Sequence, residues 1–344
     1  MAERVRWGIL STANIGRAAL VPAIQTSSNG EIAAVASRDA ERAFGYATRF
    51  NIPASYGSYE ELLRDPEIDA VYIPLPNSLH VAWVLRALDA GLHVLCEKPL
   101  GLSADECIEM AEAAEGRDLL LMEAFMYRFH PQIASALSLI ENGAIGTLKH
   151  MHAAFTFRLT RPDNIRLQPE LGGGSLMDVG CYAVNVFRTF AGEEPVEVQA
   201  FARWHENGVD EQMAGTIRFA SGVTAQFDCA LDMSRRETFL AAGTEGVLEL
   251  PRAFLPGTGS TSILLRKGYA EVEQRTIAGV DEYRLMVEHF GDCVLNGTKP
   301  AYDAREAALN MRVIEALYRS AGAEGLPMPV KNGDIAPVSA EARK

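Results

Sequence analysis

Short apolar runs alternate with helix-like stretches over residues 1–125. The runs have the length of strands, and in the stretches between them apolar residues recur every three or four positions. The predicted strands are residues 5–10, 31–36, 70–74, 93–96 and 119–123, and the predicted helices are residues 14–26, 39–50, 78–90 and 103–115. Because strands and helices that alternate in this way form βαβ units, this part predicts an α/β domain with a doubly wound parallel sheet.

The pattern changes after about residue 125, where strand-like alternation becomes dominant. The predicted strands are residues 148–158, 196–203, 211–219, 224–229, 238–242 and 246–250, and the predicted helices are residues 131–142, 181–191, 282–295 and 304–320. Residues 254–262 are rich in Gly, Pro, Ser and Thr and predict an exposed loop, and the last dozen residues predict a loose tail. Antiparallel-type strands with helices placed elsewhere in the sequence indicate a second, α+β domain.

Composition and charge agree with a globular protein and narrow its partners. A length of 344 residues suits about two domains of roughly 150 residues each. With 48% hydrophobic and 22% charged residues, the chain has enough apolar surface to form cores and is not of the disordered class. The net charge of −13 disfavours nucleic acid and anionic membranes as partners, because both are bound by clustered Lys and Arg. A phosphate-bearing ligand therefore needs a local site.

Cysteine usage and the N-terminus indicate the compartment. The cysteines are odd in number and contain no Cys-x-x-Cys pair, which is typical of a reducing environment; they are Cys96, Cys107, Cys181, Cys229 and Cys293. The first residues lack the apolar segment of a secretory signal, and no stretch approaches the roughly 18 apolar residues of a membrane-spanning helix. We predict a cytoplasmic protein.

The turn after the first predicted strand has the position of a dinucleotide-binding fingerprint. In place of G-x-G-x-x-G, the residues there are Ser11, Thr12, Ala13, Asn14, Ile15 and Gly16. Ser11 and Ala13 are small enough for the tight turn and for a pyrophosphate to approach the backbone, and Gly16 is the glycine needed for close helix–strand packing. N–H groups at a helix start attract anions. The turn predicts a pyrophosphate site, with a plain strand–turn–helix junction as the alternative.

The second predicted strand ends in Ser37, Arg38 and Asp39. An NAD-selective site usually has a carboxylate at this strand end, whereas a guanidinium beside a hydroxyl suits the 2′-phosphate of NADP. Asp39 leaves two readings open, because it allows NAD as a second cofactor and it also suits the cap of the next helix. We predict a preference for NADP.

Two further loops end on the same edge of the predicted sheet. The strand at residues 93–96 runs into Glu97, Lys98 and Pro99, and the strand before it runs into the turn at residues 74–80. Ligands of such sheets bind at the carboxyl ends of the strands, and Pro99 restricts the backbone of Lys98. Lys98 is therefore expected in the ligand crevice, with a surface lysine in an ordinary loop as the alternative.

These motifs resemble the glucose–fructose oxidoreductase / inositol dehydrogenase (Gfo/Idh/MocA) family along nearly the whole chain. The resemblance is carried by residues 36–38, 74–80, 90–99, 122–131 and 172–182. Residues 122–131, Met-Glu-Ala-Phe-Met-Tyr-Arg-Phe-His-Pro, are most similar to the branch of dimeric dihydrodiol dehydrogenases and NADP-dependent D-xylose dehydrogenases.

The resemblance implies a fold and a set of site residues. It implies a Rossmann domain at residues 1–125, then an α+β domain at residues 126–344 whose large, open, mainly antiparallel sheet pairs with another subunit in a homodimer or homotetramer. It implies that Lys98 is catalytic, with a cis bond before Pro99, and that Asp178 and Tyr182 belong to the active site. The residues expected to bind the cofactor are Ser11, Thr12, Ala13, Asn14, Ile15, Gly16, Ser37, Arg38, Leu75, Pro76, Asn77, His80, Glu97 and Lys98.

One departure from the family pattern bears on the substrate. Inositol dehydrogenases carry Asp-x-Gly-x-His-x-x-Asp, whereas here Tyr182 stands in the place of the His and Asn185 in the place of the second Asp. A free Tyr has a pKa of about 10, and a nearby ammonium favours the phenolate and lowers that pKa. We therefore predict Tyr182 as the acid/base, Lys98 as its electrostatic partner and Asp178, one helical turn before Tyr182, as a positioning group.

The sequence thus predicts an NADP-preferring oxidoreductase of CH–OH groups that acts on a sugar, polyol-like or dihydrodiol substrate. Weaker candidates for substrate binding are Glu123, Tyr127, Arg128, Arg161 and Asn185, each of which packing or solvation also explains. His150 and His152 have no further ligand at metal-site spacing, so no metal is expected. Two alternatives are a non-catalytic NAD(P)-binding regulator and an aldose–aldose oxidoreductase with tightly bound cofactor.

Overall fold

The computed structural model describes residues 4–268 and 271–331 and divides the chain into two compact units. The first unit comprises the described residues up to Phe129 together with Asp281–Ala308. The second comprises His130–Val280 and the described residues from Leu309 onward. The tail predicted for the last dozen residues lies outside the described residues.

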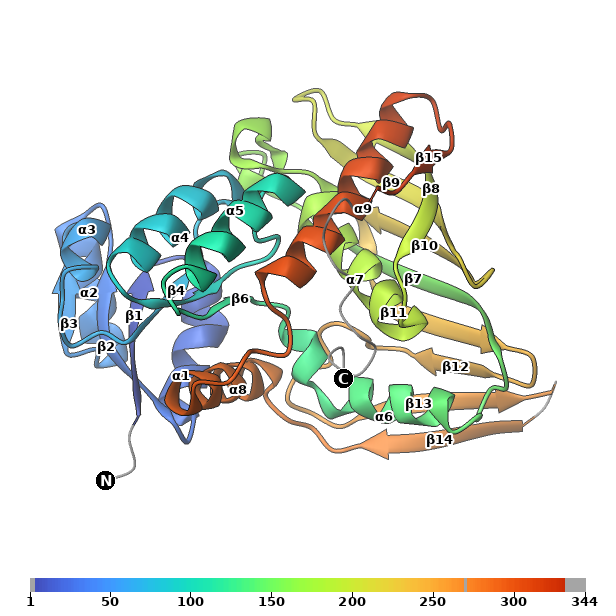
Figure 1. Cartoon of the computed structure of the whole chain (residues 1–344), viewed down its shortest axis with the longest axis horizontal. Coiled ribbons are helices and arrows are strands. Elements are labelled where there is room, and N and C mark those ends of the chain that lie inside the picture. Colours follow the sequence, from blue (N-terminus) through green and yellow to red (C-terminus); the bar gives the residue numbers. More distant parts are fainter. Residues whose placement is uncertain (1–3, 269–270, 332–344) are drawn as a thin grey trace. The chain divides into compact units, whose positions relative to one another are not determined.

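The first unit is built on a six-stranded sheet of order β3-β2-β1-β4-β5-β6, in which neighbouring strands are parallel (Figure 1). The strands are β1 Val5–Leu10, β2 Gly30–Ala36, β3 Ala54–Tyr56, β4 Ala70–Ile73, β5 His93–Cys96 and β6 Leu121–Glu123. This order is that of the doubly wound dinucleotide-binding sheet, so the predicted fold class of this part is confirmed.

Except for one short helix at Tyr59–Leu62, the helices of the first unit lie where the apolar periodicity predicts them. They are η1 Gly16–Leu20, α1 Val21–Thr26, α2 Ala40–Phe50, α3 Tyr59–Leu62, α4 His80–Asp89, α5 Ala104–Glu115 and α8 Glu282–Asn296. α4 and α5 lie side by side, as do α1 and α8 (Figure 1). The Ser103 hydroxyl accepts a hydrogen bond from the N–H of Glu106 at 3.2 Å, which caps α5 and fixes where it begins.

The helix α8 belongs to the first unit, although the sequence pattern assigned residues 126–344 to one domain. The physical reason is its apolar side, on which Met286, Val287 and Phe290 are completely buried. The ring of Phe290 lies 5.7 Å from that of Trp7 in β1. Burying a large aromatic side chain of this kind contributes roughly 2–3 kcal/mol to the free energy of folding. This contribution does not depend on how far apart the packed residues lie in the sequence.

The second unit is built on a nine-stranded sheet of order β14-β13-β12-β11-β7-β10-β9-β8-β15 (Figure 1). Its neighbouring strands are antiparallel except β7 and β10, which are parallel. The strands are β7 Leu148–Arg158, β8 Pro195–Trp204, β9 Asp210–Phe219, β10 Thr224–Ala230, β11 Asp232–Gly243, β12 Val247–Leu250, β13 Thr261–Lys267, β14 Glu271–Ile277 and β15 Met328–Pro329. The prediction of a large, mainly antiparallel sheet is confirmed.

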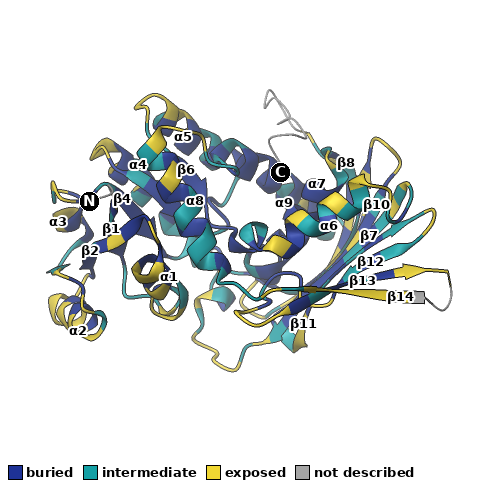
Figure 2. Ribbon diagram, turned by 90° about the horizontal axis from the view of Figure 1, so that it is seen from below, coloured by how far each residue is buried: buried dark blue, intermediate teal, exposed yellow. Residues whose placement is uncertain are grey.

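One face of this sheet is covered and the other is open. The helices α6 Pro131–Glu141 and α7 Cys181–Ala191 lie on one face, and among the described residues no helix lies on the other (Figures 1 and 2). On the open face, ion pairs join neighbouring strands, for example Arg218 in β9 with Glu197 in β8 at 3.1 Å. Polar side chains therefore alternate with the buried apolar ones along these strands, as expected for a sheet with one solvated face.

The strands β13 and β14 were not predicted, and β13 overlaps the end of the loop predicted at residues 254–262. Only Thr261, Ile263 and Leu265 of β13 are buried, and Val272 in the edge strand β14 is half exposed. An edge hairpin with so few buried positions gives little alternation to detect. None of the helices formed by the described residues is long and apolar enough to cross a membrane.

Candidate functional site

The dinucleotide turn between β1 and η1 has a backbone that favours glycine at its first position. Ser11 has φ 150°, a conformation that L-residues rarely adopt, and it stands where the fingerprint has its first glycine. The Ser11 hydroxyl accepts a hydrogen bond from the N–H of Ala13 at 3.0 Å. This bond stabilises the turn that a glycine would form without strain, so Ser11 keeps the geometry of the fingerprint although its side chain differs.

At the end of β2, the Asp39 side chain caps the next helix. Its carboxylate accepts a hydrogen bond from the N–H of Arg42 at 3.1 Å and caps α2, which is the second of the two predicted readings. Ser37 is buried, and its hydroxyl accepts from the N–H of Asp39 at 3.3 Å. The Arg38 side chain is exposed at the same strand end. The cation, rather than the carboxylate, is thus presented where a ribose 2′-substituent is expected.

Lys98 follows β5 in a loop that is fixed on both sides. The bond between Lys98 and Pro99 is cis, as the family resemblance implies. Before it, Glu97 accepts a hydrogen bond from the hydroxyl of Tyr72 at 2.6 Å. After it, the N–H of Leu100 donates to Glu123 at 2.7 Å. Glu123, predicted as a weak substrate ligand, is almost completely buried and therefore supports the Lys98 loop.

His80 connects this loop with the turn after β4. Its ring is completely buried, and its two nitrogens lie 2.9 Å from the carbonyl oxygens of Leu75 and Pro99. Burial lowers the pKa of His80, and the charge of Lys98 acts in the same direction. Both ring nitrogens contact protein backbone, so any contribution of His80 to cofactor binding acts through Leu75, Pro76 and the Lys98 loop.

Tyr182 lies in the first turn of α7 in the second unit, where aromatic rings hold it in place. Its ring centre lies 5.2 Å from that of Phe155 and 5.4 Å from that of Phe254, and the side chain is 4% exposed. Asp178 precedes it in a π-helical turn, η6 Leu176–Gly180, that leads directly into α7. π-helical turns are rare and frequent at functional sites, and the predicted regular helical spacing between Asp178 and Tyr182 did not include one.

Asp178 pairs with an arginine that the sequence analysis missed. Nε of Arg166 lies 2.6 Å from Oδ2 of Asp178, and the Arg166 guanidinium also lies over the ring of Phe157 at 5.8 Å. Arg161, predicted as a weak substrate ligand, is instead three-quarters exposed and pairs with Asp163 at 2.8 Å. Twelve positions separate Arg166 from Asp178 along the chain, with an irregular loop between them. No periodicity in the sequence could have linked the two.

The other weak candidates for substrate binding are buried or packed against protein groups. Tyr127 is completely buried and packs edge-on against Phe125, with ring centres 6.1 Å apart. The Arg128 guanidinium lies 4.6 Å from the ring centre of Tyr302. Asn185 is completely buried in α7. These positions agree with packing roles. Lys98 belongs to the first unit, and Asp178, Tyr182 and Asn185 belong to the second.

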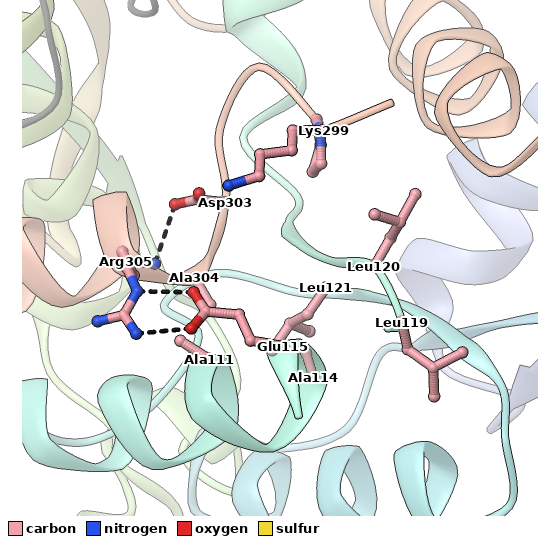
Figure 3. A pocket seen from close by; sticks show the side chains of 11 residues that line it. Ala111, Ala114, Glu115, Leu119, Leu120, Leu121, Lys299, Asp303, Ala304 and Arg305 are labelled. Carbon is pink, nitrogen blue, oxygen red and sulfur yellow. Dashed lines mark hydrogen bonds and ion pairs between the residues drawn. The ribbon is translucent and has the colours of Figure 1, made fainter. Parts of the chain in front are cut away.

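A cavity of about 80 Å³ lies in the first unit, and Figure 3 shows the side chains that line it. Leu119, Leu120 and Leu121 line it at the start of β6, beside Glu115, which pairs with Arg305 at 2.7 Å. Ligands of parallel sheets bind at the carboxyl ends of the strands, and this cavity lies at an amino end. Within residues 4–268 and 271–331, no three His, Cys, Asp or Glu side chains are grouped so as to hold a metal ion.

Two family models match the chain along most of its length. Residues 5–125 match the model described as the oxidoreductase family, NAD-binding Rossmann fold. Residues 133–249 match the GFO/IDH/MocA C-terminal domain. The chain is 43% identical to D-xylose 1-dehydrogenase (NADP(+)) 2 of Haloferax volcanii, over 92% of this chain and 97% of that protein.

Two further relatives extend the comparison. The chain is 32% identical to trans-1,2-dihydrobenzene-1,2-diol dehydrogenase of Mus musculus, over 92% of this chain and 97% of that protein. Its structure is similar to the crystal structure of a 3-ketoreductase from Actinomadura kijaniata in complex with NADP and TDP-benzene, with a TM-score of 0.88 and 30% identity. The similarity to that structure covers 92% of this chain and 98% of the ketoreductase.

Proposed function

The chain belongs to the Gfo/Idh/MocA oxidoreductase family, and we propose that it is an NADP-preferring dehydrogenase or reductase of CH–OH groups with a sugar, polyol-like or dihydrodiol substrate. The observation that carries this proposal is the fixed phenol of Tyr182, together with Asp178 of the preceding turn, which pairs with Arg166. A cofactor-binding regulator needs no immobilised proton donor. Relatives that span almost the whole chain are named as a xylose dehydrogenase and a dihydrodiol dehydrogenase.

We propose the following division of roles. NADP, when bound, supplies the nicotinamide that accepts or returns the hydride. The hydroxyl of Tyr182 takes the proton of the substrate alcohol during oxidation and returns it during reduction. The ammonium of Lys98 favours the anionic form of that phenol and donates a hydrogen bond to the reacting oxygen. Asp178, held by Arg166, accepts a hydrogen bond from a neighbouring substrate hydroxyl and so orients the sugar or diol.

A substrate screen tests this function directly. Aldoses including D-xylose, keto-sugars and trans-dihydrodiols would be assayed with NADP and NADPH by the absorbance of the reduced nicotinamide at 340 nm. We expect turnover with at least one polyhydroxy compound. Loss or gain of absorbance with none of these classes would contradict the proposal. Protein that retains NADP through purification and cycles two sugars would identify the aldose–aldose variant of the same chemistry.

Arg38→Ala is expected to weaken NADP binding at least about tenfold and to leave NAD binding nearly unchanged. The reason is the loss of a charge-assisted contact to the 2′-phosphate, which contributes roughly 1.5–3 kcal/mol and which NAD does not make. Titration calorimetry with both cofactors measures the ratio. Arg42→Ala, on the next helix and equally exposed, is the matched control. Equal losses for NADP and NAD would contradict the assignment of Arg38.

We further propose that the protein works in the cytoplasm as a homodimer or homotetramer and binds neither nucleic acid nor membranes. Its cysteines are all free and buried, which suits a reducing compartment. The net charge of −13 does not suit a general binder of polyanions. The uncovered face of the second unit's sheet supports the pairing, because Phe201 of β8, which alternates with the buried Ala200, is 61% exposed.

Light scattering is expected to give a mass of two or four chains, and Phe201→Asp is expected to shift it toward one chain. A charge in the centre of an apolar interface leaves a desolvated carboxylate without a partner, which costs several kcal/mol. Phe44→Asp is the matched control, because Phe44 is a 67% exposed phenylalanine on α2 of the other unit. A monomeric parent protein at micromolar concentration would contradict the proposal.

A further inference from the structure

The run of three glycines at residues 172–174 has no part in the chemistry proposed above, and it adjoins a buried charge. We propose that Asp210 is a positioning residue: its carboxylate fastens the start of the η6–α7 segment, which carries Asp178 and Tyr182. The proposal rests on the proposed function, because it assumes that this segment bears the reacting groups. Asp210 is the first residue of β9, far from both in sequence.

The carboxylate of Asp210 receives three hydrogen bonds. Oδ2 accepts from the hydroxyl of Ser175 and from the N–H of Leu176, both at 2.7 Å, and Oδ1 accepts from the hydroxyl of Tyr318 in α9 (Ala304–Gly322) at 2.7 Å. Two of the three donors belong to the residues that open η6. Since N–H groups at a helix start have no partner inside the helix, a carboxylate placed there both satisfies one of them and matches the helix dipole.

The carboxylate of Asp210 is buried, so its free energy depends strongly on keeping its hydrogen-bond donors in place. Asp210 is 1% exposed, and Ser175 is completely buried. Burial raises the pKa of Asp210, and the three donors act in the opposite direction. A buried carboxylate without donors is unfavourable by several kcal/mol, so Ser175 and Leu176 cannot move away without a large cost. The start of η6 is therefore tied to β9, an interior strand of the sheet.

The glycine run allows the carboxylate of Asp210 to lie close to the start of η6. Gly174 has φ +120°, and a Cβ atom there would lie 2.1 Å from Oδ1 of Asp210 and 2.9 Å from the hydroxyl oxygen of Tyr318. At Gly173, a Cβ atom would lie 2.5 Å from the carbonyl oxygen of Arg166. That same carbonyl accepts the N–H of Gly174 at 2.9 Å. The glycines thus place Asp210 against the start of η6 and Arg166 beside the segment whose Asp178 it pairs with.

Both groups of the proposed chemistry depend on this attachment. Asp178 is the third residue of η6, and its N–H donates to the carbonyl oxygen of Gly174 at 3.0 Å. Tyr182 follows one turn later. A displacement of about 1 Å in a catalytic group reduces rates up to about 100-fold. Loosening the start of η6 is therefore expected to reduce kcat and to leave cofactor binding intact, because the dinucleotide turn lies in the other unit.

Asp210→Asn tests the proposal, because it keeps the size of the side chain and removes one acceptor oxygen and the charge. We expect kcat to fall 10- to 100-fold, with the Kd for NADP within twofold of the parent protein. The substitution should accelerate hydrogen exchange of the amides at residues 176–182 more than it accelerates exchange in β7 and β10. Tyr318→Phe removes one donor and should give the same pattern at 2- to 5-fold, which remains measurable if Asp210→Asn folds poorly.

Tyr302→Phe is the matched control, because the hydroxyl of this completely buried tyrosine donates to the carbonyl oxygen of Glu306 at 3.2 Å. It should leave kcat and the exchange at residues 176–182 unchanged. Unchanged kcat in Asp210→Asn, or exchange that accelerates equally across the whole sheet, would overturn the positioning role. A failure of the proposed function is recognised separately. The exchange measurement needs no substrate, and if the acid/base role proposed for Tyr182 is wrong, Tyr182→Phe leaves turnover unaffected.

Discussion

Tyr182→Phe is expected to lower kcat by about 10²- to 10⁴-fold at neutral pH, while the Kd for NADP changes less than about twofold. The size of the loss is that of removing a general acid or base from a proton transfer. The variant removes only the hydroxyl group. The ring packs against both Phe155 and Phe254, and a phenylalanine ring makes the same contacts. Folding should therefore be nearly unaffected, so the lost rate can be assigned to the missing proton carrier.

The measurement is kcat from the absorbance at 340 nm, together with the Kd for NADP from calorimetry and the Tm. Tyr59→Phe is the matched control, because Tyr59 is also a buried tyrosine, packed edge-on against Trp83 in the first unit with ring centres 4.8 Å apart. It should keep full activity. Turnover of Tyr182→Phe equal to that of the parent protein would remove Tyr182 from the acid/base role and leave the family assignment intact.

The Rossmann unit could be predicted almost completely from the sequence, because its local signals agree with its tertiary contacts. Interior parallel strands are buried on both faces and appear as short continuous apolar runs, such as β4, whose residues are all buried. Asp39 and Ser103 cap α2 and α5 and so mark where those helices begin. Elements whose packing is weak or distant were missed. β3, for example, has three half-buried residues. The helix α8 was predicted, but its place in the first unit was not, because it packs on a strand more than 200 positions earlier.

The site could be predicted only where the chemistry lies in a continuous motif. Lys98, Asp178 and Tyr182 could be proposed as reacting or positioning groups because short family motifs contain them. Arg166, by contrast, lies in the short 3₁₀ turn Ile165–Leu167, and its contact with Asp178 follows from how the segment between β7 and η6 folds back on η6. The role of Asp210 depends on pairing β9 with the start of η6 across the chain. Motifs identify reacting groups, whereas the residues that orient those groups are determined by tertiary structure.

The two buried ionisable contacts next to the proposed site follow one physical rule. His80 and Asp210 are both almost completely buried, and each contacts backbone groups of a segment that bears a proposed catalytic residue. A buried polar group that loses its partner costs roughly 1–3 kcal/mol, and more if it is charged. Such groups therefore fix the segments they contact more strictly than apolar packing does. The Lys98 loop and the start of η6 are each held in this way.

Lys98→Met is expected to lower kcat for alcohol oxidation about 10²- to 10³-fold at neutral pH and to move the rise of the pH–rate profile to higher pH. In the role proposed above, the ammonium favours the deprotonated phenol of Tyr182. A neighbouring opposite charge of this kind lowers the pKa of an acid by about 1–3. Without it the phenolate forms only at higher pH, so part of the lost rate should return as the pH rises. Reduction needs the protonated phenol, so the pH at which the rate of reduction declines should also move to a higher value.

Lys98→Arg separates charge from geometry, because it keeps the cation and changes the shape of the donor. It should retain the pH profile of the parent protein at reduced kcat. Neither variant should unfold the loop, because its backbone is held by His80 at Pro99 and by Glu123 at Leu100. Lys149→Met, an exposed lysine on β7, is the control for a lost surface charge. If the profile of Lys98→Met is a scaled copy of the parent profile, Lys98 acts on the substrate alone and the electrostatic link to Tyr182 is wrong.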